Sequence, residues 1–203
     1  MHKQLWAGVD VGGQRKGYHV AVVGDRGLVA GPERITIASD VIGWLSQHQP
    51  AVVALDSPRS YAAAGETRRE AERLFAAARI CGIRWTPDEE RVRGNDYYGW
   101  IVNGRRLYDQ LEDTAGEWTV IEVFPTASFT IWAGPRAGGR AVWTRKALTA
   151  LGLSGFPKRR LNQDDRDAVA AAVTARLFSQ GGTRSFADEL VVPTGAHGYP
   201  TAV

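Results

Sequence analysis

Short apolar runs that end in an acidic residue and a turn occur twice in the first third of the chain. Residues 5–11 contain the first run, which closes with Asp10 and is followed by two glycines. Residues 51–58 repeat the pattern, with Asp56 followed by a serine and a proline. Uninterrupted apolar runs bounded by glycine or proline are typical of buried parallel strands. The pattern therefore predicts two strands that each end in an aspartate.

The pattern between and after these runs predicts a strand meander followed by alternating helices and strands. Residues 16–23 and 28–37 are expected to be strands joined by a tight, glycine-bounded turn. A meander followed by strand–helix alternation predicts an α/β fold with a mixed sheet and helices on its faces. Further strands are expected at residues 118–125 and 189–193, and helices between 39 and 50 and at about 66–80, 97–112, 144–151 and 162–178.

Length and composition narrow the class of protein. The 203 residues suffice for one substantial α/β domain, which we expect to carry a helical insertion at about residues 60–112 and a loosely ordered C-terminal tail. No apolar run has the length of a membrane span, and the N-terminus has no signal-peptide pattern. The single cysteine, Cys81, excludes an internal disulfide and fits a reducing compartment. We therefore expect a cytoplasmic protein, whose oligomeric state the sequence leaves open.

The charge balance leans basic without identifying a partner. The chain has 25 basic and 22 acidic residues, and most of the basic ones are arginine. Arginine suits bidentate contacts with phosphate. The chain is also rich in alanine and glycine, as GC-rich coding would give, so charge alone leaves a nucleic-acid partner open.

The two strand-end aspartates are the first candidates for chemistry. If their strands are neighbours, Asp10 and Asp56 emerge at one edge of the sheet, where open α/β sheets bind their ligands. The alternative is that each aspartate caps a turn, as this residue commonly does.

The last predicted helix adds a second acidic group. Asp164 and Asp167 are three residues apart and share a helix face. Acidic residues in a first helical turn also complement the helix dipole, which explains Asp164 better than Asp167, because Asp167 borders an alanine face expected to pack on the sheet. Glu122 lies inside a predicted strand and is the fourth candidate, with a salt bridge to an arginine as its alternative role.

Together these residues would form a site made of carboxylate oxygens. Such sites suit Mg²⁺ or Mn²⁺, and the four scattered histidines form no zinc motif. Two such cations can activate a water and stabilise the leaving oxygen in phosphodiester cleavage.

The order of the motifs resembles a known family. The chain is similar to the bacterial and archaeal family of predicted RNase H-like nucleases, a domain of unknown function within the ribonuclease H-like superfamily. The helical Asp-x-x-Asp pair resembles the Holliday-junction resolvase branch of that superfamily. The motifs that carry the resemblance are Gly8-Val9-Asp10, Leu55-Asp56-Ser57-Pro58, Glu122-Val123-Phe124-Pro125 and Asp164-x-x-Asp167-Ala168.

The resemblance implies a single RNase H-like domain with a five-stranded mixed sheet and a nuclease that uses two divalent ions. Asp10 would bridge both ions, Asp56 and Asp164 would each complete one, and Asp167 would be a further ligand or position the water. Glu122 would be a reserve ligand.

Four basic residues are candidates for binding the nucleic acid, whether DNA or RNA. Arg59 follows the second motif, and Lys158, Arg159 and Arg160 form a basic turn before the last helix. A solvated basic turn is the alternative for these three. Arg59, like Arg166 between the helical aspartates, could instead neutralise the carboxylates and weaken metal binding.

Two rival functions remain open. The fold could be an inactive scaffold that binds nucleic acid or a protein, using the arginines and aromatic residues between residues 84 and 106. The turn at residues 9–13 also resembles the phosphate-binding turn of the actin and sugar-kinase superfamily. That architecture needs a second such turn, which the sequence lacks.

Overall fold

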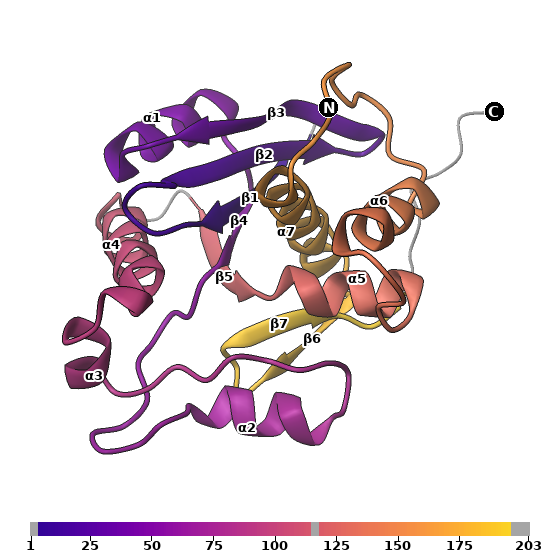
Figure 1. The fold of residues 1–203 in the computed structure, drawn as a ribbon. Helices are drawn as coiled ribbons and strands as arrows, with labels where there is room; N and C mark the ends of the chain where they lie inside the picture. Colours follow the sequence, from indigo (N-terminus) through magenta and orange to yellow (C-terminus); the bar gives the residue numbers. More distant parts are fainter. Residues whose placement is uncertain (1–3, 115–117, 196–203) are drawn as a thin grey trace.

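The computed structural model describes residues 4–114 and 118–195 of the chain (Figure 1). Within these residues the strands form one seven-stranded sheet in the order β3-β2-β1-β4-β5-β7-β6. The strands are β1 (Trp6–Val11), β2 (Tyr18–Gly24), β3 (Gly27–Ile35), β4 (Val52–Asp56), β5 (Thr119–Val123), β6 (Thr183–Phe186) and β7 (Leu190–Pro193). The helices are α1 (Ala38–His48), α2 (Glu70–Ala77), α3 (Glu89–Arg93), the 3₁₀ helix η1 (Asp96–Tyr98), α4 (Gly99–Asp113), α5 (Pro125–Ala133), α6 (Arg140–Ala150) and α7 (Gln163–Ser179).

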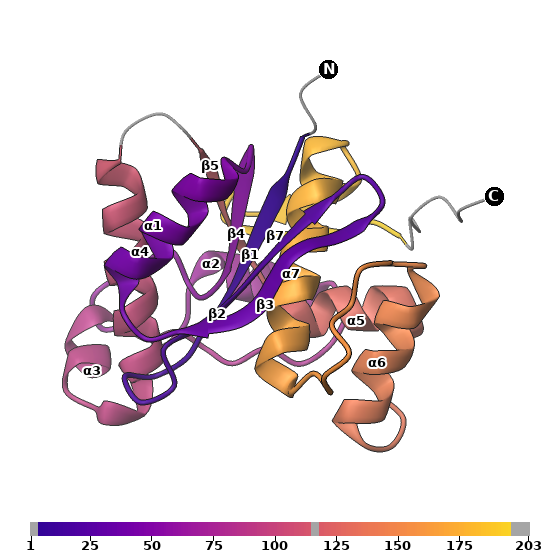
Figure 2. The same ribbon diagram turned by 90° about the horizontal axis from the view of Figure 1, so that it is seen from above.

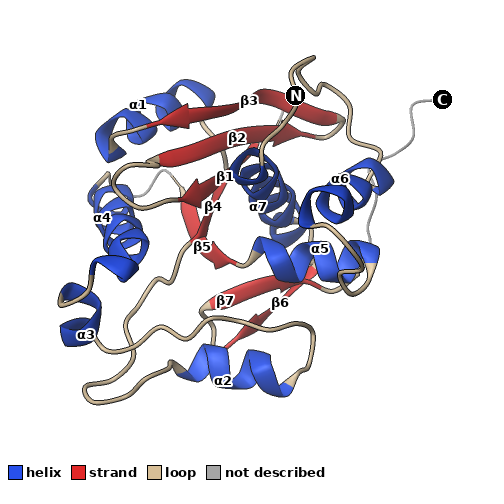
Figure 3. Cartoon of the chain, viewed as in Figure 1, coloured by secondary structure: helices blue, strands red, loops and turns tan. Residues whose placement is uncertain are grey.

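The strand directions confirm the predicted fold class. β1, β2 and β3 form an antiparallel meander, whereas β1, β4, β5 and β7 run parallel to one another (Figure 3). The sheet is therefore mixed, with helices on both faces, as expected of an RNase H-like fold.

The expected number of five strands is wrong, because a C-terminal hairpin extends the sheet. β7 pairs in parallel with β5, and β6 pairs in antiparallel fashion with β7. β6 has only four residues and its turn contains no glycine. Instead, Ala187 and Asp188 take positive φ angles of 50° and 55°. Alanine is an unusual residue at positive φ and the turn has no glycine, so the pattern predicts the strand at residues 189–193 but not its partner β6.

Proline has a second role after β5. The strand predicted over residues 118–125 ends before Pro125, which begins α5; a proline in the first helical turn loses no hydrogen bond. The sequence pattern predicts no helix at this position. α5 packs against α6 and α7 and helps to cover one face of the sheet.

The helices divide between the two faces of the sheet (Figure 2). α5, α6 and α7 cover one face and share a core with Trp6, Ala54 and Val123. α1 and α4 cover the other face and pack on alternate residues of the same strands, including Val9 and Leu55. α2 lies apart from both groups and packs beside β6 and β7.

α7 lies unusually close to β1, because both elements present small residues where they meet. Its alanine face includes Ala168 and Ala172, which are fully buried. A Cβ atom built on Gly8 would lie 2.1 Å from the backbone nitrogen of Ala172 and 2.2 Å from the carbonyl oxygen of Ala168. Only glycine fits at this position of β1 without moving the helix.

No helix within the described ranges is both long enough and apolar enough to span a bilayer. The expectation of a single domain with a helical insertion stays a prediction, although α2, α3, η1 and α4 do lie between β4 and β5. The expected C-terminal tail falls mostly on residues 196–203, which lie outside the described residues.

Candidate metal centre

Asp10 and Asp56 lie side by side at the ends of neighbouring parallel strands. The register of β1 and β4 pairs the two residues directly. Side chains alternate along a strand, and Val9 and Leu55 face α1 and α4, so Asp10 and Asp56 face the α7 side of the sheet. The prediction that both carboxylates meet at one sheet edge is therefore confirmed by the strand pairing.

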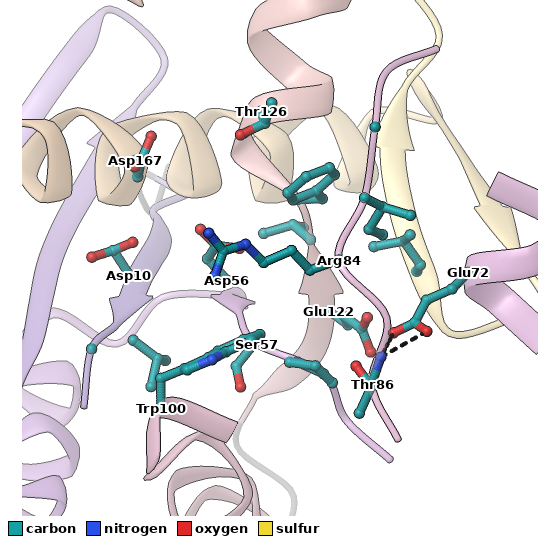
Figure 4. Close-up of a pocket in the computed structure, with 18 of the residues that line it drawn as sticks. Asp10, Asp56, Ser57, Glu72, Arg84, Thr86, Trp100, Glu122, Thr126 and Asp167 are labelled. Carbon is teal, nitrogen blue, oxygen red and sulfur yellow. Dashed lines mark hydrogen bonds between the residues drawn. The ribbon is translucent and has the colours of Figure 1, made fainter. Parts of the chain in front are cut away.

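Asp167 of α7 completes a cluster with these two residues. The close contact between α7 and β1 at Gly8 brings the first turns of the helix against the end of the strand. One oxygen from each of Asp10, Asp56 and Asp167 lies within 4.8 Å of the others. Figure 4 shows the three side chains converging on one space from two strands and a helix.

The three carboxyl groups resist ionisation. Burial raises the pKa of Asp10 well above its usual value, and the charges of Asp56, Asp167 and Asp164 raise it further. Burial is also the main cause of the raised pKa of Asp56, to which the charge of Asp167 adds. The pKa of Asp167 rises to about 6, again chiefly through burial. Like charges crowded in a poorly hydrated space favour either protonation or a bound cation.

An arginine from α6 reaches the cluster. Arg140 Nη2 lies 3.0 Å from Asp167 Oδ2, and Gln163 Nε2 donates a hydrogen bond of 2.8 Å to Asp167 Oδ1. The charge of Arg140 also lowers the pKa of Asp56. Its side chain is 44% exposed, so it contacts the cluster from the rim.

Asp164 lies next to the cluster but outside it. Its Oδ2 atom is 3.3 Å from Lys16 Nζ and 4.0 Å from His19 Nε2. The charge of Asp164 nevertheless raises the pKa of Asp10. The structure thus brings Asp167, rather than Asp164, to the two strand-end aspartates, although both helical residues face this edge of the sheet.

Glu122 is held by arginine on the opposite side of β5. Ile121 and Val123 face the α7 side, so the side chain between them faces away from it. Arg69 Nη2 lies 2.5 Å from Glu122 Oε1, and the backbone N–H of Arg59 donates to Glu122 Oε2 at 2.7 Å. The salt bridge considered from the sequence is therefore the arrangement observed, and Glu122 is not part of the three-carboxylate cluster.

The two arginines that follow or separate the aspartates in sequence turn away from them. Arg59 Nη2 lies 2.9 Å from Glu112 Oε1. Arg166 Nε donates to Thr144 Oγ1 of α6 at 2.8 Å. Arg59 and Arg166 therefore bind residues outside the carboxylate cluster. Arg140 is the arginine that contacts the cluster and could neutralise its charge.

The basic turn lies beside α7. Arg159 Nη1 forms a 2.5 Å ion pair with Asp165, which also accepts a hydrogen bond from the backbone N–H of Asn162 in a capping box. Lys158 and Arg160 are exposed. Arg159 thus has a structural partner, whereas the other two have side chains in solvent.

The carboxylates open into a cavity of about 620 Å³. Its charged lining includes Lys16 and Arg140 beside the aspartates, and Arg84 reaches into it from the segment that follows α2. Trp100, near the start of α4, forms part of another wall of the cavity.

Sequence reasoning missed these four lining residues as members of the site. Lys16 had a usable signal, because it follows the glycine turn after β1 and must return near Asp10. The signal for Arg140 was weaker: two glycines precede it at the start of a helix. Arg84 and Trp100 were noted only as part of an arginine- and aromatic-rich segment, and their positions depend on how that segment folds back over the sheet.

The residues of the cluster fit a hard divalent cation. All three side chains offer carboxylate oxygens, which Mg²⁺ and Mn²⁺ prefer, and their separation allows a shared ion. The pKa values of the three carboxyl groups stay raised, chiefly by burial, even though Lys16 and Arg140 beside the cluster lower them.

A family model and solved structures show similarity to this chain. A family model described as "Protein of unknown function (DUF429)" matches residues 8–191. A structure of T. thermophilus RuvC in complex with a Holliday junction substrate is 18% identical, with a TM-score of 0.49 over 88% of this chain and 96% of that chain. A second Thermus thermophilus RuvC structure is 18% identical, with a TM-score of 0.48 over 90% and 99%. No curated protein matches. The matched range contains all three residues of the cluster.

Proposed function

Because the chain belongs to the family described as protein of unknown function (DUF429), its chemistry has to be argued from its site, and we propose that it is a divalent-metal-dependent nuclease. The observation that carries this proposal is the convergence of Asp10, Asp56 and Asp167 within 4.8 Å of one another. Their raised pKa values support it, because such a cluster is costly in the folded protein unless a cation accompanies it.

Each carboxylate has a distinct proposed role. Asp10 would be the ligand that the ions share, and Asp56 and Asp167 would each complete one, because one oxygen from each of the three lies within 4.8 Å of the others. Bound Mg²⁺ or Mn²⁺ would supply a lowered pKa for an attacking water and charge stabilisation for the leaving oxygen. Asp164, oriented by Lys16, would accept a hydrogen bond from that water.

Basic side chains beside the carboxylates would hold the substrate. Lys16 and Arg140 line the same cavity and would contact the non-bridging oxygens of the phosphate to be cleaved. The exposed Lys158 and Arg160 would contact phosphates further along a DNA or RNA chain.

Metal binding and cleavage test the proposal together. Purified protein should bind Mn²⁺ in calorimetry and cleave labelled DNA or RNA, and Asp10→Asn should abolish both. Asp25→Asn is the matched control, because Asp25 is exposed in the β2–β3 turn. Absence of both Mn²⁺ binding and cleavage of every DNA, RNA and junction substrate would refute the nuclease function.

One observation favours the alternative of an inactive binding scaffold. Arg140 pairs with Asp167 at 3.0 Å and could replace a metal permanently. Under this alternative the natural protein gives no heat with Mn²⁺, and Arg140→Ala creates Mn²⁺ binding. Under the nuclease proposal the natural protein already binds Mn²⁺, and Arg140→Ala chiefly slows cleavage.

A further inference from the structure

A short segment, the strap (residues 82–86), borders the carboxylate cavity. It returns from α2 toward α3 and contributes four residues to the cavity lining, including Arg84 and Thr86. The backbone N–H of Thr86 donates to both carboxylate oxygens of Glu72, at 3.0 and 2.9 Å. Glu72 is buried and also paired with Arg69. The strap is therefore fixed to α2 by buried, charge-assisted hydrogen bonds.

Arg84 also joins the strap to the segment that leads into α4. Arg84 Nη1 donates a hydrogen bond to Tyr97 Oη, and the guanidinium carbon lies 5.6 Å from the centre of the Tyr97 ring. Tyr97 belongs to η1, directly before the helix that carries Trp100. Figure 4 shows the Arg84 side chain among the residues that line the cavity. The strap, with Arg84, therefore forms part of the cavity wall.

The walls of this cavity suit an unpaired nucleotide. The volume of about 620 Å³ lies within the range that proteins use for small ligands. Trp100 offers an aromatic surface on one wall, and bases removed from a helix stack on such side chains. Lys16 and Arg84 supply positive charge for the phosphates that flank the base.

We propose that the cavity accepts one unpaired nucleotide of a single strand, with its base on Trp100 and its phosphate at the carboxylates. This inference rests on the proposed nuclease function and gives it a substrate class. In a duplex the bases are paired and stacked on one another, so no base is free to lie on Trp100 unless the duplex opens. The protein thus favours single-stranded DNA or RNA, in which the base is already free.

Binding of matched oligonucleotides tests this selection without requiring cleavage. Fluorescence anisotropy would compare a labelled single strand with a hairpin duplex of the same length, in Ca²⁺ and again in EDTA. We expect the single strand to bind at least about tenfold more tightly. Trp100→Ala should weaken single-strand binding by about 5- to 150-fold, which corresponds to 1–3 kcal/mol for one stacked base. Trp100→Phe should retain most of the affinity.

Trp44→Ala is the matched control, because Trp44 is a half-buried tryptophan of α1 that does not line the cavity. This variant should bind like the natural protein. A free dinucleotide that competes as well as the strand would assign the cavity to small phosphodiesters instead and overturn the proposal. Duplex bound as tightly as single strand would overturn the inference while the nuclease function stands. Failure to bind or cleave either form would refute both.

Discussion

Two carboxylates of α7, Asp167 and Asp165, are expected to affect stability in opposite directions. The pKa of Asp167 rises to about 6 in the folded protein, chiefly through burial, whereas that of an unfolded aspartate stays near its usual 3.8. A difference of about 2 units corresponds to about 3 kcal/mol. Asp167 holds its proton more tightly in the folded state than in the unfolded state. The free energy of unfolding therefore falls as pH rises between about 4 and 6 and stays reduced above that range.

Asp167→Asn removes this ionisation. The amide loses one charge-assisted hydrogen bond, at a cost of about 1.5 kcal/mol, so in EDTA at pH 7.5 the variant should be about 1.5 kcal/mol more stable than the natural protein. For a chain of this length that is about 3–6 °C in the unfolding midpoint. With Mn²⁺ the order should reverse, because a ligand that binds the folded state stabilises the natural protein more.

Asp165→Asn is the internal control two residues away. Burial alone would raise the pKa of Asp165, but Arg159, the Asn162 backbone and His19 outweigh it and lower the pKa. The ionised carboxylate therefore stabilises the folded state, and the variant should be less stable at pH 7.5 and equally responsive to Mn²⁺. Urea unfolding from pH 4 to 8 measures both variants. A destabilised Asp167→Asn protein in EDTA would refute the electrostatic argument.

Three further variants extend the argument. Asp10→Asn should unfold at a higher temperature than the natural protein in EDTA, measured by differential scanning fluorimetry, because it relieves the most crowded charge. Gly8→Ala should lose about 1–3 kcal/mol in urea unfolding and weaken Mn²⁺ binding, since its Cβ would overlap the α7 backbone. Gly13→Ala, with open space around it, should change neither quantity. Arg69→Leu should lose about 3–5 kcal/mol in urea unfolding, because Glu122 is left buried without its partner, and adding Glu122→Gln should restore part of that loss. Unchanged stability of Gly8→Ala or Arg69→Leu would contradict the packing and pairing described.

The parts of the fold that depend on local patterns could be predicted from the sequence. Asp10 and Asp56 follow apolar runs closed by turns, and the small-residue face of α7 is visible as a run of alanines, so the convergence of strand ends and helix could be anticipated. The sequence favours Asp167 over Asp164 only weakly, through its place beside the alanine face, because the choice depends on how far α7 rotates as it packs against Gly8.

Contacts between distant segments explain what the sequence did not reveal. Arg69, directly before α2, pairs with Glu122, 53 residues later in the chain. Arg140 reaches Asp167 only because α6 packs beside α7. No local spacing encodes either pair, since each follows from the packing of helices that are separate in sequence.

The sequence separation of the three clustered aspartates has a consequence for the order of events during synthesis. Asp10 and Asp56 are made early and lie on adjacent strands, whereas Asp167 arrives more than a hundred residues later on a helix that must dock against β1. Long-range contacts of this kind form late, because the intervening chain must first be ordered. The emerging protein therefore carries an incomplete site until α7 docks, so any activity that needs the third carboxylate begins only when the fold is nearly finished.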